Sequence, residues 1–341
     1  MRLATKQEIA EWDKLLQQNP DGGDILQSKT MARVKETQGW QTEFWVHETS
    51  FGAVYATVLT RRFRGFGKLA YLARGPGVIN AEQLREIVEQ NKKLKGFFAV
   101  KMEPPIPLGT KLAHLKKVPN IQANASTVII DLRPSEEEIL ASFRQRARRE
   151  IRAADKDGIV VKKVKLTDET IDQMFDLYAE TGRRAPFFVR PKNYYETFWR
   201  YWHAAGEGDL YFAYVSGSKM PIAGAFICKM GQKALYKDGG SQRTAHKHFA
   251  HKLQWEVMKD LKAQGITDYD LHGVPPHDRL HDPTHSQAGL AMFKLSFNEE
   301  ITECVGAYDQ ILRPRRYALW AKWGQRIYQS LAYRVHKTTL F

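Results

Sequence analysis

Two stretches of this chain present the same succession of segments, and this repetition constrains the fold more than any other feature. Each contains helices, three neighbouring extended runs, a helix and a further extended run. The extended triplets cover residues 43–47, 53–60 and 69–73 in the first stretch and 209–215, 221–229 and 233–239 in the second. Three adjacent strands followed by one late crossover helix favour a mixed sheet over a doubly wound parallel one. The sequence therefore predicts two copies of one α/β unit.

Length and charge restrict the class of protein further. The 341 residues suffice for two domains, and 52 Lys and Arg against 38 Asp and Glu give a net charge of +14, which attracts polyanions. The two cysteines form no disulfide framework, which fits a reduced compartment. The first ten residues lack the apolar run of a signal peptide, and no run reaches the roughly 18 apolar residues of a membrane span. We expect a cytoplasmic protein.

A strongly basic segment begins the second stretch. Residues 143–165 contain nine basic and three acidic side chains. The pattern predicts one helix from Ser135 to about residue 154, and on it Arg144, Arg148 and Arg152 share one face. A row of guanidinium groups suits a phosphate backbone, whereas aligned like charges repel one another unless something neutralises them. We expect contact with a polyanion; the alternative is a solvated helix face.

The C-terminal stretch, residues 313–337, is also basic, because no acidic residue follows Asp309. Four large apolar residues follow helical spacing there: Trp320, Trp323, Ile327 and Leu331. A basic amphipathic helix with tryptophans can lie in a membrane interface, but Trp is also a good core residue. The pattern slightly favours a helix that docks on the core, and it leaves peripheral membrane contact open.

Three other patterns are weak by themselves. Gly239 and Gly240 precede a predicted helix at 246–264, where backbone N–H groups could bind an anion, although tight turns explain most such pairs. Four histidines in residues 272–285 are separated by prolines, so no helix face can present them to a metal, and we expect none. Lys294 in its apolar turn would ordinarily be solvated surface.

Several short blocks, none specific alone, occur in a distinctive order. They are Gln27 to Lys35, Gly75-Pro76, Lys101 to Pro104, Asp157-Gly158, Val189 to Pro191 with Tyr194, Gly239 to Ser241, Tyr269 to Val274, and Phe293-Lys294 before Phe297. Over nearly its whole length the chain thereby resembles the FemABX family of non-ribosomal peptidyltransferases, and the smaller FemX-like members most closely. The resemblance implies an α/β fold with two tandem GNAT-like acyltransferase domains, at residues 1–132 and 133–306. The tail, 307–341, would pack back on the first domain, and Arg152 to Val160 leaves no room for the coiled-coil arm of larger members.

The resemblance also implies a reaction. The chain would move an amino acid from aminoacyl-tRNA to an amine of the stem peptide of a peptidoglycan precursor, which builds the interpeptide bridge. Because the ester is already activated, the enzyme would mainly position two substrates, without a cofactor or metal. The acceptor would be lipid-linked (lipid II) or UDP-linked (UDP-MurNAc-pentapeptide), and the basic tail favours the lipid-linked form at the inner face of the membrane. We expect a monomer.

Residue roles follow from the same resemblance. Lys35 and Arg190 resemble the two cations that hold the diphosphate of the precursor, and Tyr194 resembles a tyrosine that lines that site. Glu103 occupies the place of an acidic residue near the acceptor amine; it is either a base or a structural carboxylate near Lys101.

The donor side has its own candidates. Phe293 and Lys294 resemble the pair that faces the aminoacyl end of the tRNA, and Lys294 could stabilise the oxyanion formed during attack on the ester. Arg144, Arg148 and Arg152 would bind the tRNA. The chain departs from the family at Tyr236-Lys237-Asp238 and at Ala307, so its acceptor pocket differs from that of better-known members.

Two other functions stay open. One is an acyl-CoA-dependent N-acyltransferase on the same fold, for which Gln242-Arg243 after Gly240 is a poor version of the expected pyrophosphate turn. The other is a non-catalytic RNA-binding protein, against which no RNA-binding module is found and no aromatic residues alternate with the arginines.

Overall fold

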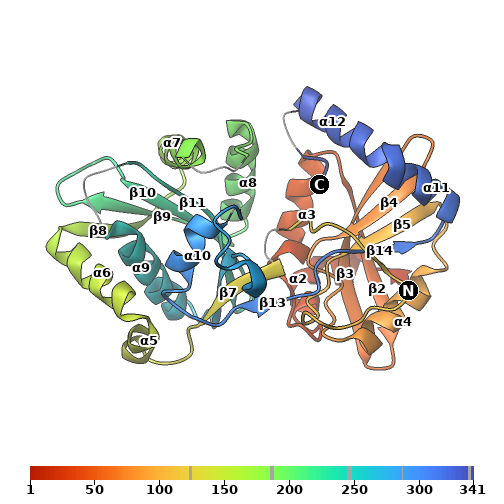
Figure 1. The fold of residues 1–341 in the computed structure, drawn as a ribbon, viewed down its shortest axis with the longest axis horizontal. Helices are drawn as coiled ribbons and strands as arrows, with labels where there is room; N and C mark the ends of the chain where they lie inside the picture. The colour runs from red at the N-terminus through yellow and green to blue at the C-terminus, as the bar shows by residue number, and fades with distance from the viewer. Residues whose placement is uncertain (123–124, 185–187, 244–247, 286, 337–338) are drawn as a thin grey trace. The chain divides into compact units, whose positions relative to one another are not determined.

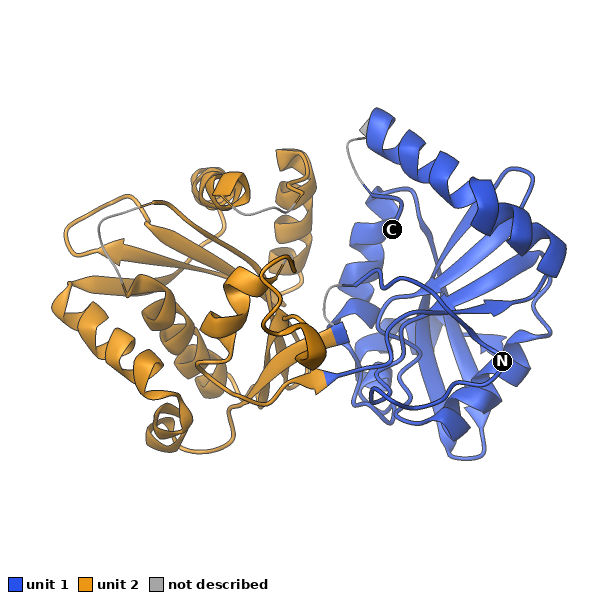
Figure 2. Cartoon of the chain, viewed as in Figure 1, with its two compact units in different colours: residues 1–125, 303–341 blue, residues 126–302 orange. Residues whose placement is uncertain are grey.

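The computed structural model describes residues 1–122, 125–184, 188–243, 248–285, 287–336 and 339–341. The chain forms two compact units, residues 1–125 with 303–341 (unit 1) and residues 126–302 (unit 2) (Figure 2). No helix in the described ranges is long and apolar enough to cross a bilayer. The expected boundaries after 132 and 306 both lie a few residues too late. The reason is that residues 126–131 already belong to the sheet of unit 2, whereas residues 302–303 form the last strand of that sheet and the chain returns to unit 1 from there.

Unit 1 is built on one seven-stranded sheet with the order β1-β2-β3-β4-β5-β14-β6. Its strands are β1 (Arg2–Leu3), β2 (Gln41–Thr49), β3 (Gly52–Phe63), β4 (Gly67–Leu72), β5 (Phe97–Met102), β6 (Lys116–Lys117) and β14 (Tyr308–Ile311). The pair β4–β5 is parallel and runs from Lys68 to Leu72 of β4, and the other neighbouring strands of this sheet are antiparallel. The sheet is therefore mixed, as expected.

The helices of unit 1 come from the beginning, the middle and the end of its sequence. They are α1 (Lys6–Ala10), α2 (Trp12–Leu16), η1 (Ile25–Gln27), α3 (Lys29–Thr37), α4 (Ala81–Asn91), α11 (Pro314–Leu319), the π-helical turn η4 (Trp320–Gly324) and α12 (Gln325–His336) (Figure 1). The crossover helix α4 starts where the Asn80 side chain accepts the Gln83 N–H (2.9 Å), and it buries Leu84, Ile87 and Val88 against the sheet. Its position between β4 and β5 makes that pair parallel.

Unit 2 repeats the arrangement with the order β13-β7-β12-β11-β10-β9-β8. Its strands are β7 (Ser126–Asp131), β8 (Ile159–Val164), β9 (Gly208–Val215), β10 (Ala223–Met230), β11 (Lys233–Ser241), β12 (Asp268–Gly273) and β13 (Thr302–Glu303). Its helices are α5 (Glu136–Ser142), α6 (Gln145–Lys156), α7 (Asp168–Arg184), α8 (Lys192–Ala204), α9 (Phe249–Ala263), η3 (His277–Arg279) and α10 (Ala288–Lys294). Only Asp157 and Gly158 connect α6 to β8, so no helical arm is inserted there.

The single helix expected from Ser135 is in fact two. Phe143 and Arg144 are extended, with ψ of 150° and 148°, and they separate α5 from α6. The Phe143 ring is buried edge-on against Trp255 and Phe297, at centroid distances of 5.6 and 5.1 Å, and this packing fixes the break. Arg144 therefore caps α6 and does not share a helix face with the two later arginines.

The parallel pair β11–β12 separates partway along its length. Backbone pairing joins Lys233 to Asp268, Ala234 to Tyr269 and Leu235 to Asp270, and none is found beyond that point although both strands continue. Backbone groups that do not pair between the two strands can bind other partners, such as a side chain or an extended ligand. Because β4–β5 in unit 1 is paired throughout, the two units differ at the place where a ligand could enter the sheet.

The glycines of β11 are positioned by packing. Gly239, Gly240 and Ser241 lie inside the strand, so they form neither the anion-binding turn nor the tight turn that the sequence left open. A Cβ on Gly240 would lie 2.5 Å from backbone atoms of α7, at Leu177 and Tyr178. The glycine therefore permits the close approach of α7 to the sheet.

Candidate functional site

Lys294 ends α10 in unit 2 and is buried. Its ammonium donates to the carbonyls of His272 (3.0 Å) and Gly273 (2.8 Å), at the end of β12, beyond the point where β12 leaves β11. An ammonium carries three N–H donors, and these two carbonyls take two of them. Two of the blocks that define the family resemblance, Tyr269 to Val274 and Phe293-Lys294, thus meet at one buried cation.

The burial of Lys294 has an electrostatic consequence. Burial lowers the pKa of Lys294 to about 8, against a smaller opposing effect of the Asp270 carboxylate, which favours the charged form. Asp270 is itself held in place, because it accepts hydrogen bonds from the Thr127 hydroxyl and from the His272 N–H. Close to neutral pH this lysine is charged but poised to lose its proton.

Phe293 is half-buried beside a histidine that sequence reasoning missed. The His251 ring contacts Phe293 edge-on at 4.9 Å, and its Nε2 lies 3.1 Å from the Ser296 hydroxyl. That hydroxyl donates to the Phe293 carbonyl (2.5 Å), so His251 is the donor. Burial lowers the pKa of His251 to about 4 and keeps it neutral. A lone histidine inside a helix gave no signal in the sequence.

Arg190 and Tyr194 form a second cluster in unit 2. The Arg190 guanidinium carbon lies 4.4 Å from the centre of the Tyr194 ring. The backbone N–H of Arg190 donates to the Tyr195 hydroxyl (3.2 Å). Stacking on an aromatic face orients a guanidinium, and the planar group matches the geometry of an anion such as a phosphate. The structure therefore brings together these two residues, which the resemblance assigned to one site.

The same cluster contains an acidic residue that marks a departure from the family. Asp238 of β11 is buried and accepts the Trp199 indole N–H (2.9 Å), and Lys237 lies 3.7 Å away. Tyr178 packs on Tyr195 at 4.8 Å, and burial, together with the Asp238 charge, raises the pKa of Tyr178. Beyond its pairing with β12, β11 thus carries a carboxylate among aromatic rings.

The candidates of unit 1 are also buried. Lys35 lies on α3, and its ammonium donates to the Gln38 side chain (3.2 Å). Gln27, from the same block, donates to the Ala73 carbonyl (2.7 Å) and lies against Gly75, where a Cβ would be 2.9 Å from it. The blocks at 27–35 and 75–76 therefore pack against each other.

Glu103 is held by three donors. The Tyr71 hydroxyl donates to its Oε2 (2.6 Å), and the N–H groups of Ile121 and Gln122 donate to its Oε1 (2.8 and 3.0 Å). Lys101, the expected neighbour, instead pairs with Asp309 of β14 (2.6 Å). These contacts favour the structural alternative for Glu103, although with different partners from the one expected.

Replacement of Glu103 by Gln tests this assignment. The amide would present its own N–H groups to donors that now reach a carboxylate, and we expect a loss of about 1–3 kcal/mol in the free energy of unfolding. The reaction rate per folded molecule should fall less than about tenfold, because a structural carboxylate would affect the rate only through the fold. Urea unfolding and initial rates measure the two effects. A loss of more than about 100-fold in rate at unchanged stability would instead indicate a base.

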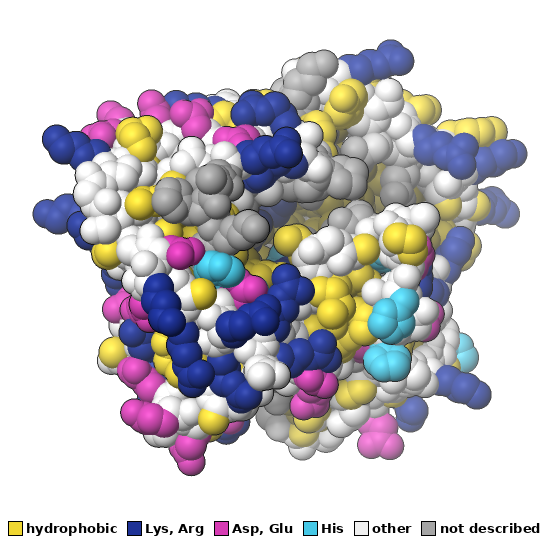
Figure 3. Space-filling model, turned by 60° about the vertical axis from the view of Figure 1, so that its left-hand side comes forward, with side chains coloured by type: hydrophobic (Ala, Val, Ile, Leu, Met, Phe, Trp, Pro, Cys, Tyr) yellow, Lys and Arg dark blue, Asp and Glu magenta, His cyan; other side chains and the backbone are white. Residues whose placement is uncertain are grey.

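The basic residues of α6 are only partly arranged as expected. Arg148 and Arg152 line a pocket of about 750 Å³ between α5 and α6, together with Arg149, Lys156 and Glu137. Arg144 lies outside that lining and pairs with Glu299. Figure 3, which brings the side of unit 2 forward, shows Lys and Arg side chains gathered on its lower part. Two of the three expected arginines thus share a basic surface.

The described histidines of the loop at 272–285 do not gather into a metal site. Across the described residues, no three His, Cys, Asp or Glu side chains are grouped as a metal would require. Asp282 instead accepts hydrogen bonds from Thr284 and Arg279 within its own loop.

Comparisons with known proteins show which family and fold the chain resembles. The profile of the acetyltransferase (GNAT) domain matches residues 141–279, which lie in unit 2. A lipid II:glycine glycyltransferase of Staphylococcus haemolyticus (strain JCSC1435) is 21% identical, over 91% of this chain and 93% of the relative. The protein of the same name from Staphylococcus aureus (strain MRSA252) is 22% identical over the same shares. The first alignment spans 394 positions, more than the 341 residues of this chain, so the relative contains insertions that are missing here.

Solved structures extend the comparison to the fold. The crystal structure of FemX superposes with a TM-score of 0.79 at 20% identity and covers 94% of this chain and 98% of FemX. The structure of L-PGS from Bacillus licheniformis gives a TM-score of 0.51 at 14% identity, covering 94% and 97%. The two mixed sheets and these matches define a transferase with the GNAT fold, as expected from the sequence. Within that class, the resemblance to the FemABX family is confirmed.

Proposed function

We propose that the chain transfers an amino acid from aminoacyl-tRNA to an amine of the stem peptide of a peptidoglycan precursor and so builds the interpeptide bridge. The observation that carries this proposal is Lys294, a buried ammonium with two of its donors fixed, at the end of β12 where β11 and β12 separate. Relatives along nearly the whole chain are named lipid II:glycine glycyltransferases, which supports a lipid-linked acceptor.

The reaction requires little beyond positioning and charge. The acceptor amine attacks the ester carbonyl and forms a C–N bond, the C–O bond to the tRNA ribose breaks, and the amine proton leaves with the ribose hydroxyl. Negative charge develops on the carbonyl oxygen in between, and the third N–H of Lys294 would donate to it. Phe293 would pack beside the aminoacyl group. No step calls for a metal, a cofactor or a covalent enzyme intermediate.

Binding of the two substrates is assigned to the remaining candidates. Lys35 and Arg190 would hold the diphosphate of the precursor, with Tyr194 orienting the guanidinium. Arg148 and Arg152, with their neighbours on α6, would contact the tRNA backbone, and Arg144 would contribute only after release from Glu299. Aminoacyl-tRNA is available in the cytoplasm, so the reaction would occur on that side of the membrane.

The GNAT match keeps an acyl-CoA donor as the second candidate. An experiment that supplies each donor separately distinguishes the two candidate functions. Full-length enzyme is incubated with lipid-linked or UDP-linked pentapeptide and with either pooled radiolabelled aminoacyl-tRNA or radiolabelled acetyl-CoA. Label from aminoacyl-tRNA in the precursor, abolished by ribonuclease, supports the proposal. Label from acetyl-CoA alone would replace it with the second candidate, and tRNA binding without any transfer would favour the RNA-binding alternative.

A further inference from the structure

The C-terminal segment of unit 1, residues 313–336, is attached to the sheet by one side. Trp320 is buried, and its ring contacts Phe63 (4.5 Å), Phe66 (5.4 Å) and Phe98 (5.4 Å). The Tyr328 hydroxyl also accepts the Arg64 N–H (3.1 Å), which ties α12 to the β3–β4 hairpin. Core docking is therefore right for Trp320, and it fixes the orientation of the whole segment.

Five further apolar residues of the segment are exposed and form a regular series. They are spaced four residues apart and have exposed fractions between 49% and 67%: Leu319, Trp323, Ile327, Leu331 and Val335. Spacing of four keeps successive side chains close together on a helix surface. Single exposed apolar residues are ordinary, but a continuous row of five marks an interaction surface. We call this row the apolar stripe.

Cations flank the apolar stripe. Six of them lie on the segment itself, and none forms an ion pair with another described residue: Arg313, Arg315, Arg316, Lys322, Arg326 and Arg334. No acidic residue follows Asp309. The surface is therefore basic and apolar at once, without the carboxylates that would neutralise it internally.

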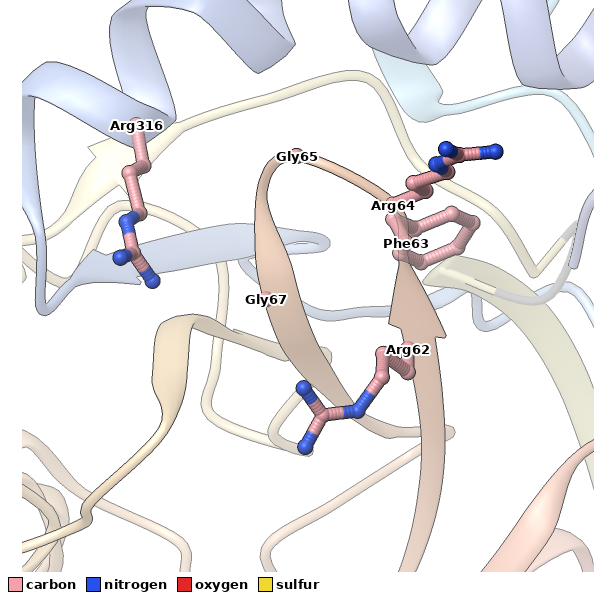
Figure 4. A pocket seen from close by; sticks show the side chains of 6 residues that line it. All are labelled: Arg62, Phe63, Arg64, Gly65, Gly67 and Arg316. Carbon is pink, nitrogen blue, oxygen red and sulfur yellow. The ribbon is translucent and has the colours of Figure 1, made fainter.

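The β3–β4 hairpin extends this basic border. Arg62, Arg64 and Arg316 line a pocket of about 490 Å³ with Gly65 and Gly67. In Figure 4, Arg316 comes down from α11 and Arg62 reaches out from β3 toward the same side of β4, beside Gly67, while Arg64 points away. Two guanidinium groups that face one pocket, neither of them ion-paired in the described structure, suit an anionic phosphate.

We propose that the apolar stripe and its flanking cations form a docking surface for an anionic lipid bilayer. The stripe lies at the depth of the headgroups and upper acyl chains, Trp323 anchors it, and the cations contact lipid phosphates. A second copy of this chain is a poor occupant, because it would place two basic surfaces against each other. An anionic membrane satisfies both the charge and the apolar area. The surface shares no residue with those assigned to transfer, so its test needs no substrate.

The test measures binding of the full-length chain to vesicles. Vesicles of phosphatidylcholine alone are compared with vesicles that contain about 30 mol % phosphatidylglycerol, by co-sedimentation and by Trp fluorescence. We expect binding to the anionic vesicles that weakens at least tenfold without the anionic lipid, and that weakens with added salt.

Two variants separate the apolar and charged contributions. Trp323→Ser with Ile327→Ser removes stripe residues that are already exposed, and Lys322→Glu with Arg326→Glu reverses charge beside them. Each pair should reduce partitioning at least tenfold at an unchanged melting temperature. Leu108→Ser with Met220→Ser, which removes equally exposed apolar residues elsewhere, is the matched control and should bind as the wild type does. The proposal is overturned if the wild type does not bind, if both stripe variants bind normally, or if the stripe variants instead abolish self-association.

Discussion

Replacement of Lys294 by Met is expected to lower kcat by about 10²–10³-fold, the effect of removing one oxyanion donor. Met fills a similar volume without the charge, so the fold should tolerate the change. Initial rates with saturating aminoacyl-tRNA and precursor measure the loss. A variant that retains more than about a tenth of the wild-type rate would show that Lys294 has no part in the chemical step.

The same variant has an unusual expected effect on stability. The pKa of Lys294 falls from 10.5 to about 8 on folding, so the folded state binds the proton more weakly than the unfolded state. The resulting destabilisation, on the order of 3 kcal/mol, is fully present below pH 8 and disappears as pH rises toward 10.5. Loss of hydrogen bonds to two carbonyls offsets it by about 1 kcal/mol each. Lys294→Met should therefore be as stable as the wild type or more stable at pH 7.

The pH dependence identifies which form of Lys294 acts. If the ammonium stabilises the oxyanion, activity requires the protonated form, which is lost as pH rises through about 8. Lys294→Arg keeps the charge at every accessible pH. The ratio of wild-type to Lys294→Arg kcat/KM cancels the titration of the acceptor amine, and it should fall between pH 7 and pH 9. A ratio that rises over this interval would mean that neutral Lys294 acts as a base.

Simultaneous replacement of Lys35 and Arg190 by Met is expected to raise KM for the precursor by about 10²–10³-fold. Each charge-assisted hydrogen bond to a phosphate contributes about 1.5–3 kcal/mol, and two such losses approach this figure after partial compensation. The KM for aminoacyl-tRNA should change little. Steady-state kinetics with each substrate varied in turn separate the two constants.

A matched control removes the same charges from elsewhere in each unit. Lys93 and Arg183 are exposed, one in unit 1 and one in unit 2, and neither has an assigned role. Lys93→Met with Arg183→Met should leave KM for the precursor within about twofold of the wild type, since surface charges contribute little to specific binding. An equal effect of both double variants would reduce the role of Lys35 and Arg190 to general electrostatic attraction.

Regular patterns in the sequence predicted the regular parts of the fold. The runs at 97–102 and 159–164 coincide with β5 and β8. The first is buried throughout, and the second is rich in β-branched residues although only Ile159 is buried. The strand β14 was missed: only four residues long and with Asp309 and Gln310 at its centre, it is stabilised by pairing with β5, far away in the sequence. The break at Phe143 was missed for a similar reason, because its cause is contact with Trp255 and Phe297.

The candidate site depended even more on the third dimension. The sequence pattern around Lys294 is that of a surface lysine, and only the family resemblance singled it out. Its burial and its two carbonyl partners arise because α10 folds back against the end of β12. His251 and the Trp199–Asp238 contact gave no signal, because single residues in a helix or strand have no periodicity. The nearest hint in the sequence was the predicted strand at 233–239, near whose end Asp238 follows Lys237.

The most direct test of the central claim is the mass of the acceptor after reaction. Purified enzyme is incubated with lipid-linked pentapeptide and a pool of aminoacyl-tRNAs, and the precursor is analysed by mass spectrometry with Lys294→Met in parallel. The account predicts a product heavier by whole amino-acid residues attached through an amide to the stem peptide, formed by the wild type and reduced in the variant. An unchanged precursor mass with every lipid-linked and UDP-linked acceptor, from enzyme shown to be folded, would contradict it.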